Sequence, residues 1–325
     1  MRSFLSVVLL PFTAVAALAA PRVDNVLVRM VPPGATSLVG AHMDRLIASD
    51  LYQKLVAQQK LPQLDQFARQ TGFDPRRDVR ELLLTTLPQG NVVLARGTFN
   101  LKQDPVPAGS PATKLLRHGQ YNVRVLDNYG YCLLDSSLAA AGELPAVIAA
   151  LDEWQTGSHT GAKALLARVA SIDPQTPLWG VSTGFASFLA ANLPRVGNGI
   201  DFSSIFKGID STWFTASVAS GFQAAIHCTT ATEKDAIALR DTAKGLVGLG
   251  RLNVPESEPE LLRFWDGFTV EQTGRSFSLN ADIAGNLIDQ MVHLFSFPGG
   301  RGGPGGRGGS GRGGRTGPAV NRSLV

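Results

Sequence analysis

The sequence predicts an α+β fold with a mostly antiparallel sheet. Pairs of strand-like segments separated by short turns recur along the chain, within residues 121–134, 211–229 and 268–281. Antiparallel strands can be joined by such tight turns, whereas parallel strands need a long crossover. Segments with helical periodicity lie between these pairs, so we expect helices packed against the sheet.

The body divides near residues 157–161 into two halves, 20–157 and 158–297, which we interpret as related. In the first half the Asp127–Gly130 turn joins two strands, Asp74-Pro75 opens a helix through Leu84, and Pro145 lies in the first turn of another helix. The strands are expected at 36–43, 91–99, 121–126, 131–134 and 138–141. The helices are expected at 51–59, around 64–68, at 74–84 and at 144–154.

The second half repeats the order of strand, helices, antiparallel strands and helix. Thr232 and Asp235 resemble a capping box, which predicts the start of a long helix with one apolar stripe. Gly274 lies at the turn of the last strand pair. The strands are expected at 178–182, 211–218, 222–229, 268–273 and 276–281. The helices are expected at 165–169, 185–193, 232–247, 260–265 and 284–295.

Residues 1–19 have the features of a cleavable signal peptide. A positive start precedes the apolar stretch Val7–Leu18, and Ala17-Leu18-Ala19 supplies the small-x-small pattern that signal peptidase needs. We expect cleavage before Ala20 and a periplasmic or secreted protein. The alternative is an uncleaved anchor, but the apolar run is shorter than the ~20 residues of a spanning helix. No transmembrane segment is expected after cleavage.

Residues 298–325 form a Gly/Arg-rich segment that we expect to be disordered, because it has almost nothing apolar to bury. The formal net charge is +4, and this segment holds arginines but no acid, so the body is slightly acidic. A body that binds nucleic acid specifically is therefore not expected. As an alternative role, the tail could bind anionic polymers or lipid head groups. The arginines concerned are Arg301, Arg307, Arg312, Arg315 and Arg322.

One motif raises the possibility of catalysis. Gly180-Val181-Ser182-Thr183-Gly184 fits the G-x-S-x-G pattern of a serine nucleophile between a strand and a helix. Asp266 or Asp282, followed by His293, would complete a triad in the required order. The fold expected around it is antiparallel, however, and His293 falls inside an apolar helix. Parallel strands on both sides of Ser182 would favour a hydrolase.

The remaining reactive residues predict no metal site and no cofactor. The five histidines have no ligand spacing, and Cys132 and Cys228 form no C-x-x-C motif. Because export permits oxidation, a Cys132–Cys228 disulfide is one alternative, and two buried thiols are the other.

Three segments resemble parts of a family of exported bacterial proteins of unknown function. They are Leu61–Leu84, Leu178–Phe185 and the hairpin Phe268–Ile283. The resemblance spans about Thr36 to Phe295 and implies a bacterial envelope or secreted protein. It brings no catalytic residues with it. We therefore expect a non-enzymatic binding or structural protein, with an unknown protein or an anionic envelope polymer as its partner.

Overall fold

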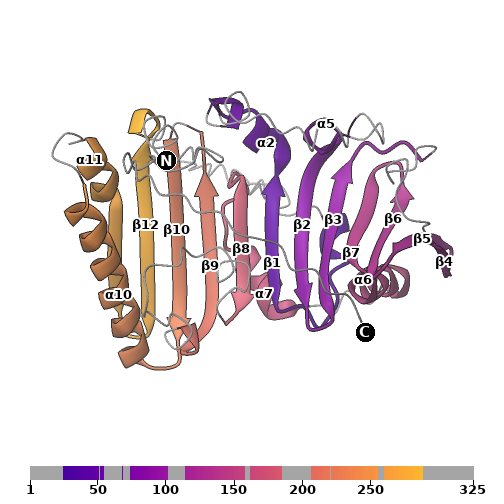
Figure 1. The fold of residues 1–325 in the computed structure, drawn as a ribbon. Helices are drawn as coiled ribbons and strands as arrows, with labels where there is room; N and C mark the ends of the chain where they lie inside the picture. Colours follow the sequence, from indigo (N-terminus) through magenta and orange to yellow (C-terminus); the bar gives the residue numbers. More distant parts are fainter. Residues whose placement is uncertain are drawn as a thin grey trace, which may run out of the picture.

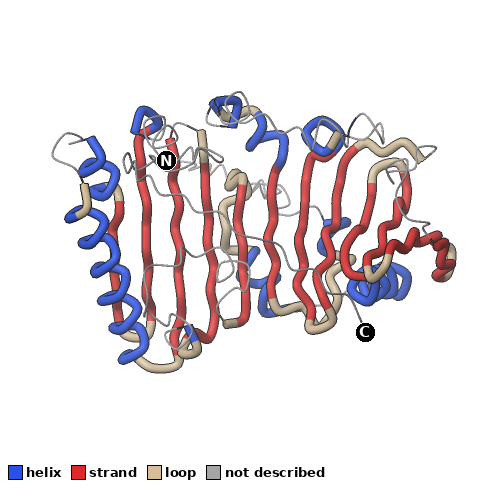
Figure 2. The backbone as a smooth tube through the Cα atoms, viewed as in Figure 1, coloured by secondary structure: helices blue, strands red, loops and turns tan. Residues whose placement is uncertain are grey.

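A computed structural model describes residues 25–50, 52–54, 68, 74–101, 114–157, 162–184, 206–219, 221–254 and 260–287. Their strands form one antiparallel sheet in the order β11-β12-β10-β9-β8-β1-β2-β3-β7-β6-β5-β4 (Figures 1 and 2). The first seven strands are β1 Ser37–His42, β2 Val79–Leu87, β3 Gly90–Gly97, β4 Lys114–His118, β5 Tyr121–Leu126, β6 Tyr129–Asp135 and β7 Leu138–Glu143. The others are β8 Leu178–Thr183, β9 Ile209–Ser217, β10 Gly221–Thr230, β11 Phe268–Thr273 and β12 Ser276–Ala284.

The α+β class and the mostly antiparallel sheet are confirmed. The described helices are α1 Asn25–Val28, α2 Met43–Ile47, α5 Pro75–Asp78, α6 Leu144–Thr156, α7 Lys163–Val169, α10 Glu233–Leu252 and α11 Glu260–Asp266. Pro145 lies in the first turn of α6, and the Thr232 hydroxyl oxygen accepts a hydrogen bond from the Asp235 backbone N–H at 3.2 Å. These two helix starts follow from local chemistry that the sequence shows directly.

The two halves of the chain contribute to the same sheet. β1 of the first half pairs antiparallel with β8 of the second, so the sheet runs without a break from β11 to β4. In each half a first strand is followed by a long connection and then a hairpin, β2–β3 or β9–β10. A later strand pairs with the outer strand of that hairpin, β7 on β3 and β12 on β10.

One predicted element is wrong. The helix expected at 74–84 stops after one turn, because only Pro75–Asp78 is helical and β2 begins at Val79. Asp74 does cap that turn, since its carboxylate accepts from the Arg76 backbone N–H at 3.0 Å. Burial then alternates along β2, which lies between β1 and β3, so sheet pairing overrides the local helical signal. The edge strand β4 was not predicted at all.

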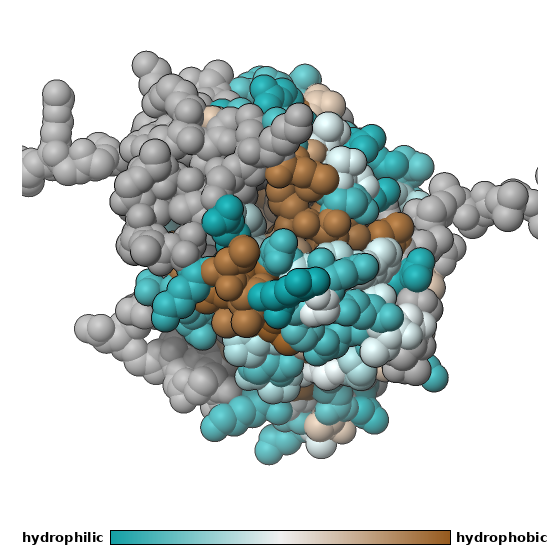
Figure 3. Space-filling model, turned by 90° about the vertical axis from the view of Figure 1, so that its right-hand side faces the viewer, coloured by the Kyte–Doolittle hydropathy of each residue, from teal (hydrophilic) through white to brown (hydrophobic). Residues whose placement is uncertain are grey.

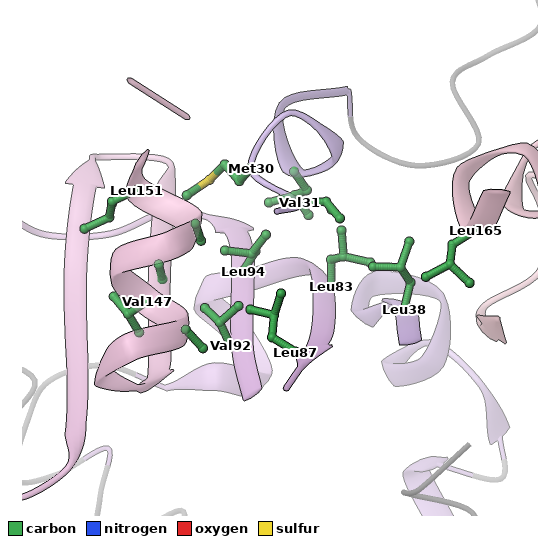
Figure 4. Packing of buried hydrophobic residues seen from close by; sticks show 14 of the residues in the cluster. Met30, Val31, Leu38, Leu83, Leu87, Val92, Leu94, Val147, Leu151 and Leu165 are labelled. Carbon is green, nitrogen blue, oxygen red and sulfur yellow. The ribbon is translucent and has the colours of Figure 1, made fainter. Parts of the chain in front are cut away.

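One face of the sheet, which we call the α6 face, carries Leu83 and Leu94. Helices α1, α6 and α7 pack on it (Figure 1). Val147 and Leu151 of α6 are fully buried, and they belong to the same cluster as Val92 and Leu94 (Figure 4). Burying each such side chain contributes about 1.5–3 kcal/mol relative to exposure. The main hydrophobic core therefore lies on this face, under the first half of the sheet.

The opposite face, which we call the α10 face, is covered at the other end of the sheet. Leu239 of α10 packs in a cluster with Cys228 and Phe277, while Phe264 of α11 packs beside Ile283. The strand registers align Cys228 with other buried or half-buried side chains in one row across the sheet. Because side chains alternate between the two faces along a strand, this row lies on the α10 face, away from the main core. The row contains Cys228, Thr212, Ser182, Ser37 and Thr86.

The described helices thus cover opposite faces at opposite ends of the sheet. Two quarters of the sheet have no described helix running across them, although Met43 of the short helix α2 contacts the edge of one. One is the α10 face of β2, β3, β7 and β6, whose side chains are mainly apolar. The other is the α6 face of β9, β10, β12 and β11, whose side chains are mainly polar. These two surfaces are where the described part of the fold leaves room for a ligand.

Candidate functional site

A hollow lies on the α10 face of the first half of the sheet. It has a volume of about 720 Å³, and its lining includes residues of α2 and α5, the helices at the upper edge of the sheet in Figure 1. Met43 of α2 and Val79, Leu82 and Phe99 lie along one side of it. We call it the β3–β7 cavity.

The sequence makes this cavity by alternating long and short side chains across neighbouring strands. In the registered row Leu82–Ala95–Ala139–Leu133, two alanines on β3 and β7 lie between two leucines on β2 and β6. The next row ends in Ala141 opposite Tyr131 of β6. The short side chains leave a trough along β3 and β7, and the long ones form its walls.

The rim of the cavity is polar, but its charges are already paired. Arg77 of α5 donates from Nε to Asp78 Oδ1 at 2.7 Å and from Nη2 to Asp78 Oδ2 at 3.0 Å. Asp78 Oδ2 also accepts from the Asp74 backbone N–H at 2.8 Å. Burial by itself would raise the pKa of Asp78, but these hydrogen bonds outweigh it and hold the pKa below its usual value. The cavity therefore offers an apolar interior without an uncompensated charge.

Ser182 lies in β8 but lacks the setting of a nucleophile. Both neighbours of β8, β1 and β9, run antiparallel to it. The Ser182 side chain is only 3% exposed, and its hydroxyl donates to the Gly184 carbonyl at 3.0 Å. Thr212 donates to the same carbonyl at 3.0 Å. The parallel surroundings that would favour a hydrolase are absent from both sides of this strand.

The proposed partners of Ser182 do not gather around it. Asp266 lies in α11, where its half-exposed carboxylate is bound by Arg251. Three strands, β9, β10 and β12, separate β8 from β11, the strand that follows α11. Asp282 lies in β12 beside Gln223 of β10. His293 and the tail arginines lie outside the described residues, as do residues 1–19.

The two cysteines are free thiols, so the disulfide alternative is wrong for this structure. Cys132 lies in β6 and Cys228 in β10, with β7, β3, β2, β1, β8 and β9 between them in the sheet. At about 4.8 Å per strand the two positions are far beyond the span of a disulfide. Both thiols are buried, and burial raises the pKa of each to about 11.

We expect these thiols to resist alkylation in the folded protein. A pKa near 11 leaves almost no thiolate at pH 8, and burial excludes the reagent. Intact mass after iodoacetamide treatment should show no adduct under native conditions and two adducts after unfolding in guanidinium without reductant. A mass lower by two hydrogens, with no adduct on unfolding, would instead demonstrate a bridge.

Other features of the described residues bear on the class of site. Among them no group of three or more His, Cys, Asp or Glu side chains is arranged to hold a metal ion. None of the described helices combines the length and apolar character that a membrane crossing requires.

The end of the molecule formed by β4 to β6 shows hydrophobic side chains among hydrophilic ones (Figure 3). Leu115 and Leu116 of the edge strand β4 are 60% and 40% exposed.

The fold and the cavity define an α+β protein built on one continuous antiparallel sheet with a ligand-sized apolar hollow. No protein-family model matches the chain, and no curated protein matches its sequence. Solved structures of TP0453 are similar to it in outline. Crystal form I has a TM-score of 0.45 at 5% identity, covering 82% of this chain and 96% of that one. Crystal form III has a TM-score of 0.47 at 6% identity, covering 82% and 98%. Likenesses at this level support no functional inference.

Sequence reasoning missed the cavity, although one signal was present. Strands that are apolar on both faces belong to a sheet with something packed on each side. The run Ala139-Ala140-Ala141 in β7 and the run Val92–Ala95 in β3 have that character. Which of these residues share a trough depends on the strand order β2-β3-β7-β6, in which β7 pairs with β3 across a 40-residue gap in sequence.

Proposed function

We propose that this chain is an exported, non-enzymatic binding protein that holds a mainly hydrocarbon ligand in the β3–β7 cavity. The observation that carries the proposal is the cavity itself, about 720 Å³ of mostly apolar space on a sheet face. Ligand pockets in proteins commonly have volumes of roughly 300–1,000 Å³ and mainly apolar linings with a few polar groups.

A packing defect is a poor account of a hollow this large. The trough is open to solvent, so its apolar lining is an exposed hydrophobic surface, and such surfaces commonly mark binding sites. Ala95 of β3 and Ala139 of β7 are cross-strand neighbours on the same face of the sheet, so two small side chains lie side by side and form the trough. A ligand that fills the trough regains the dispersion contacts and the apolar burial that the alanines leave unused.

The charges around the cavity support a ligand without an essential ionic group. Arg77 and Asp78 already form a two-point ion pair at the rim. A charged head group would have to compete with that pair, so the rim offers it no unpaired counter-charge. We expect affinity to depend on apolar fit, with the polar rim contacting whichever end of the ligand remains near water.

The test is titration with N-phenyl-1-naphthylamine, a neutral fluorophore that brightens in apolar sites. The wild-type protein should bind it saturably, and Ala139→Phe should weaken binding about tenfold or more, because the ring fills the trough. Ala95→Leu places a smaller side chain in the same trough, so it should weaken fluorophore binding less than Ala139→Phe does. The matched control is Ala167→Phe on the exposed side of α7. Absence of saturable binding in the wild type, or equal binding in Ala139→Phe and Ala167→Phe, would refute the proposal.

Export is part of the proposal, and it rests on the signal-peptide pattern of residues 1–19. A mature protein that begins at Ala20, measured by intact mass in the exported fraction, would support it, and retention of Met1 would contradict it. The alternative of an envelope-associated protein depends on the Gly/Arg tail. If deletion of residues 298–325 leaves binding to anionic vesicles unchanged, that alternative fails. We also infer that the repeated strand order of the two halves reflects an internal duplication.

A further inference from the structure

A second hollow lies on the α6 face of the second half of the sheet, at the opposite end and on the opposite face from the β3–β7 cavity. It has a volume of about 220 Å³. The strand registers align Trp213 of β9, His227 of β10, Ser278 of β12 and Glu271 of β11 in one row across it. We call this the His227 slot.

The slot exists because a short side chain lies between two long ones. Ser278 separates the His227 ring from the Glu271 carboxylate, and two strand spacings make that gap about 10 Å between backbones. The rest of the lining is rich in hydroxyl groups. The hydroxyl-bearing residues are Thr229, Thr273, Ser276 and Ser278.

One wall of the slot is a fixed aromatic surface. The rings of Trp213 and His227 stack with their centroids 3.8 Å apart and their planes 10° apart. Trp213 is itself packed against the main core, so the stack is held in place from behind. The side of the imidazole facing Ser278 is thus available to a ligand as a rigid, flat wall.

Two opposite charges also line the slot. Arg168 reaches it from α7, and Glu271 lies at its other side. Among the described residues neither side chain forms a salt bridge, and they do not pair with each other. Burial is the main cause that lowers the pKa of His227, with Arg168 adding to the decrease and Glu271 opposing it. The imidazole is therefore neutral at neutral pH, and it offers one donor and one acceptor.

We propose that the His227 slot binds a single neutral sugar ring. A pyranose has an apolar face that stacks on an aromatic wall and an equator of hydroxyl groups that both donate and accept hydrogen bonds. Glu271 accepts, Arg168 donates, and the serine and threonine hydroxyls do both. Because the two charges are opposite in sign, the slot gives no net attraction to an anion or a cation. This inference does not depend on the β3–β7 cavity.

Saturation-transfer NMR with four probes tests the inference: the methyl glycosides of glucose, galactose, mannose and N-acetylglucosamine. At least one should bind saturably at millimolar concentration. Glu271→Gln should weaken that binding about tenfold, which matches the loss of a charge-assisted hydrogen bond, and His227→Ala should weaken it at least as much. The matched control is Glu233→Gln, an exposed acid in the first turn of α10.

Three results would overturn the inference. The first is that none of the four glycosides binds. The second is that binding persists unchanged in both Glu271→Gln and His227→Ala, with circular dichroism confirming that each variant is folded. The third is that glucuronate or glucosamine binds about tenfold tighter than every neutral sugar, which would identify a charged ligand class. Ala139→Phe, which fills the other cavity, should leave sugar binding unchanged.

Discussion

Replacing Trp179 with alanine is expected to lower the free energy of unfolding by about 3–5 kcal/mol. Trp179 is 2% exposed, lies in β8 and belongs to the main core. Its cross-strand partner is Gly40 of β1, so the indole covers the place where the two halves of the sheet join. Truncation removes apolar burial and leaves a void at that junction.

Urea unfolding followed by circular dichroism measures this effect. A matched comparison is Trp265→Ala in α11, because Trp265 is only half-buried and lies at the end of the sheet. We expect the loss at Trp179 to exceed the loss at Trp265 by about 1 kcal/mol or more. Equal losses would show that the β1–β8 junction has no special role in stability.

Replacing Gly40 with valine is expected to destabilise the protein by about 1–3 kcal/mol through overpacking. A side chain at this position would lie well inside van der Waals contact of the Trp179 ring atoms Cζ2 and Cε2. That ring is buried and cannot swing into solvent, so the strand pair β1–β8 would have to separate.

The Trp179→Ala background provides the control for this prediction. Without the indole, a valine at position 40 has space, so the double variant should be more stable than the sum of the two single effects predicts. The expected coupling is about 1 kcal/mol or more in the direction of rescue. Additive losses would mean that the clash between Gly40 and Trp179 is not the cause.

Local chemistry made several elements predictable. The Thr232–Asp235 capping pair gives the start of α10, Pro145 gives the start of α6, and the 121–134 segment gives the β5–β6 hairpin. In each case the signal and its partner lie within a few residues, so the sequence window contains the whole interaction. The α+β class follows from the same hairpins.

Long-range pairing explains what could not be predicted. Asp74-Pro75 is a sound helix start, yet β2 begins at Val79 because β1 and β3 supply partners from distant parts of the chain. No sequence feature gives the distance between Cys132 and Cys228. The strand order shows that they lie far apart in the sheet. The Gly180–Gly184 motif fits a nucleophile turn by letters alone, and the antiparallel neighbours of β8 give it a different setting.

The sequence by itself determined the fold class, the capped helix starts and the hairpins, because these depend on neighbouring residues and composition. The tertiary structure decided that both halves share one sheet, that Gly40 lies under Trp179, and that alanines of β3 and β7 face each other beneath an open trough. The physical reason is that strand order and register bring together residues far apart in the chain, and a cavity exists only between such residues.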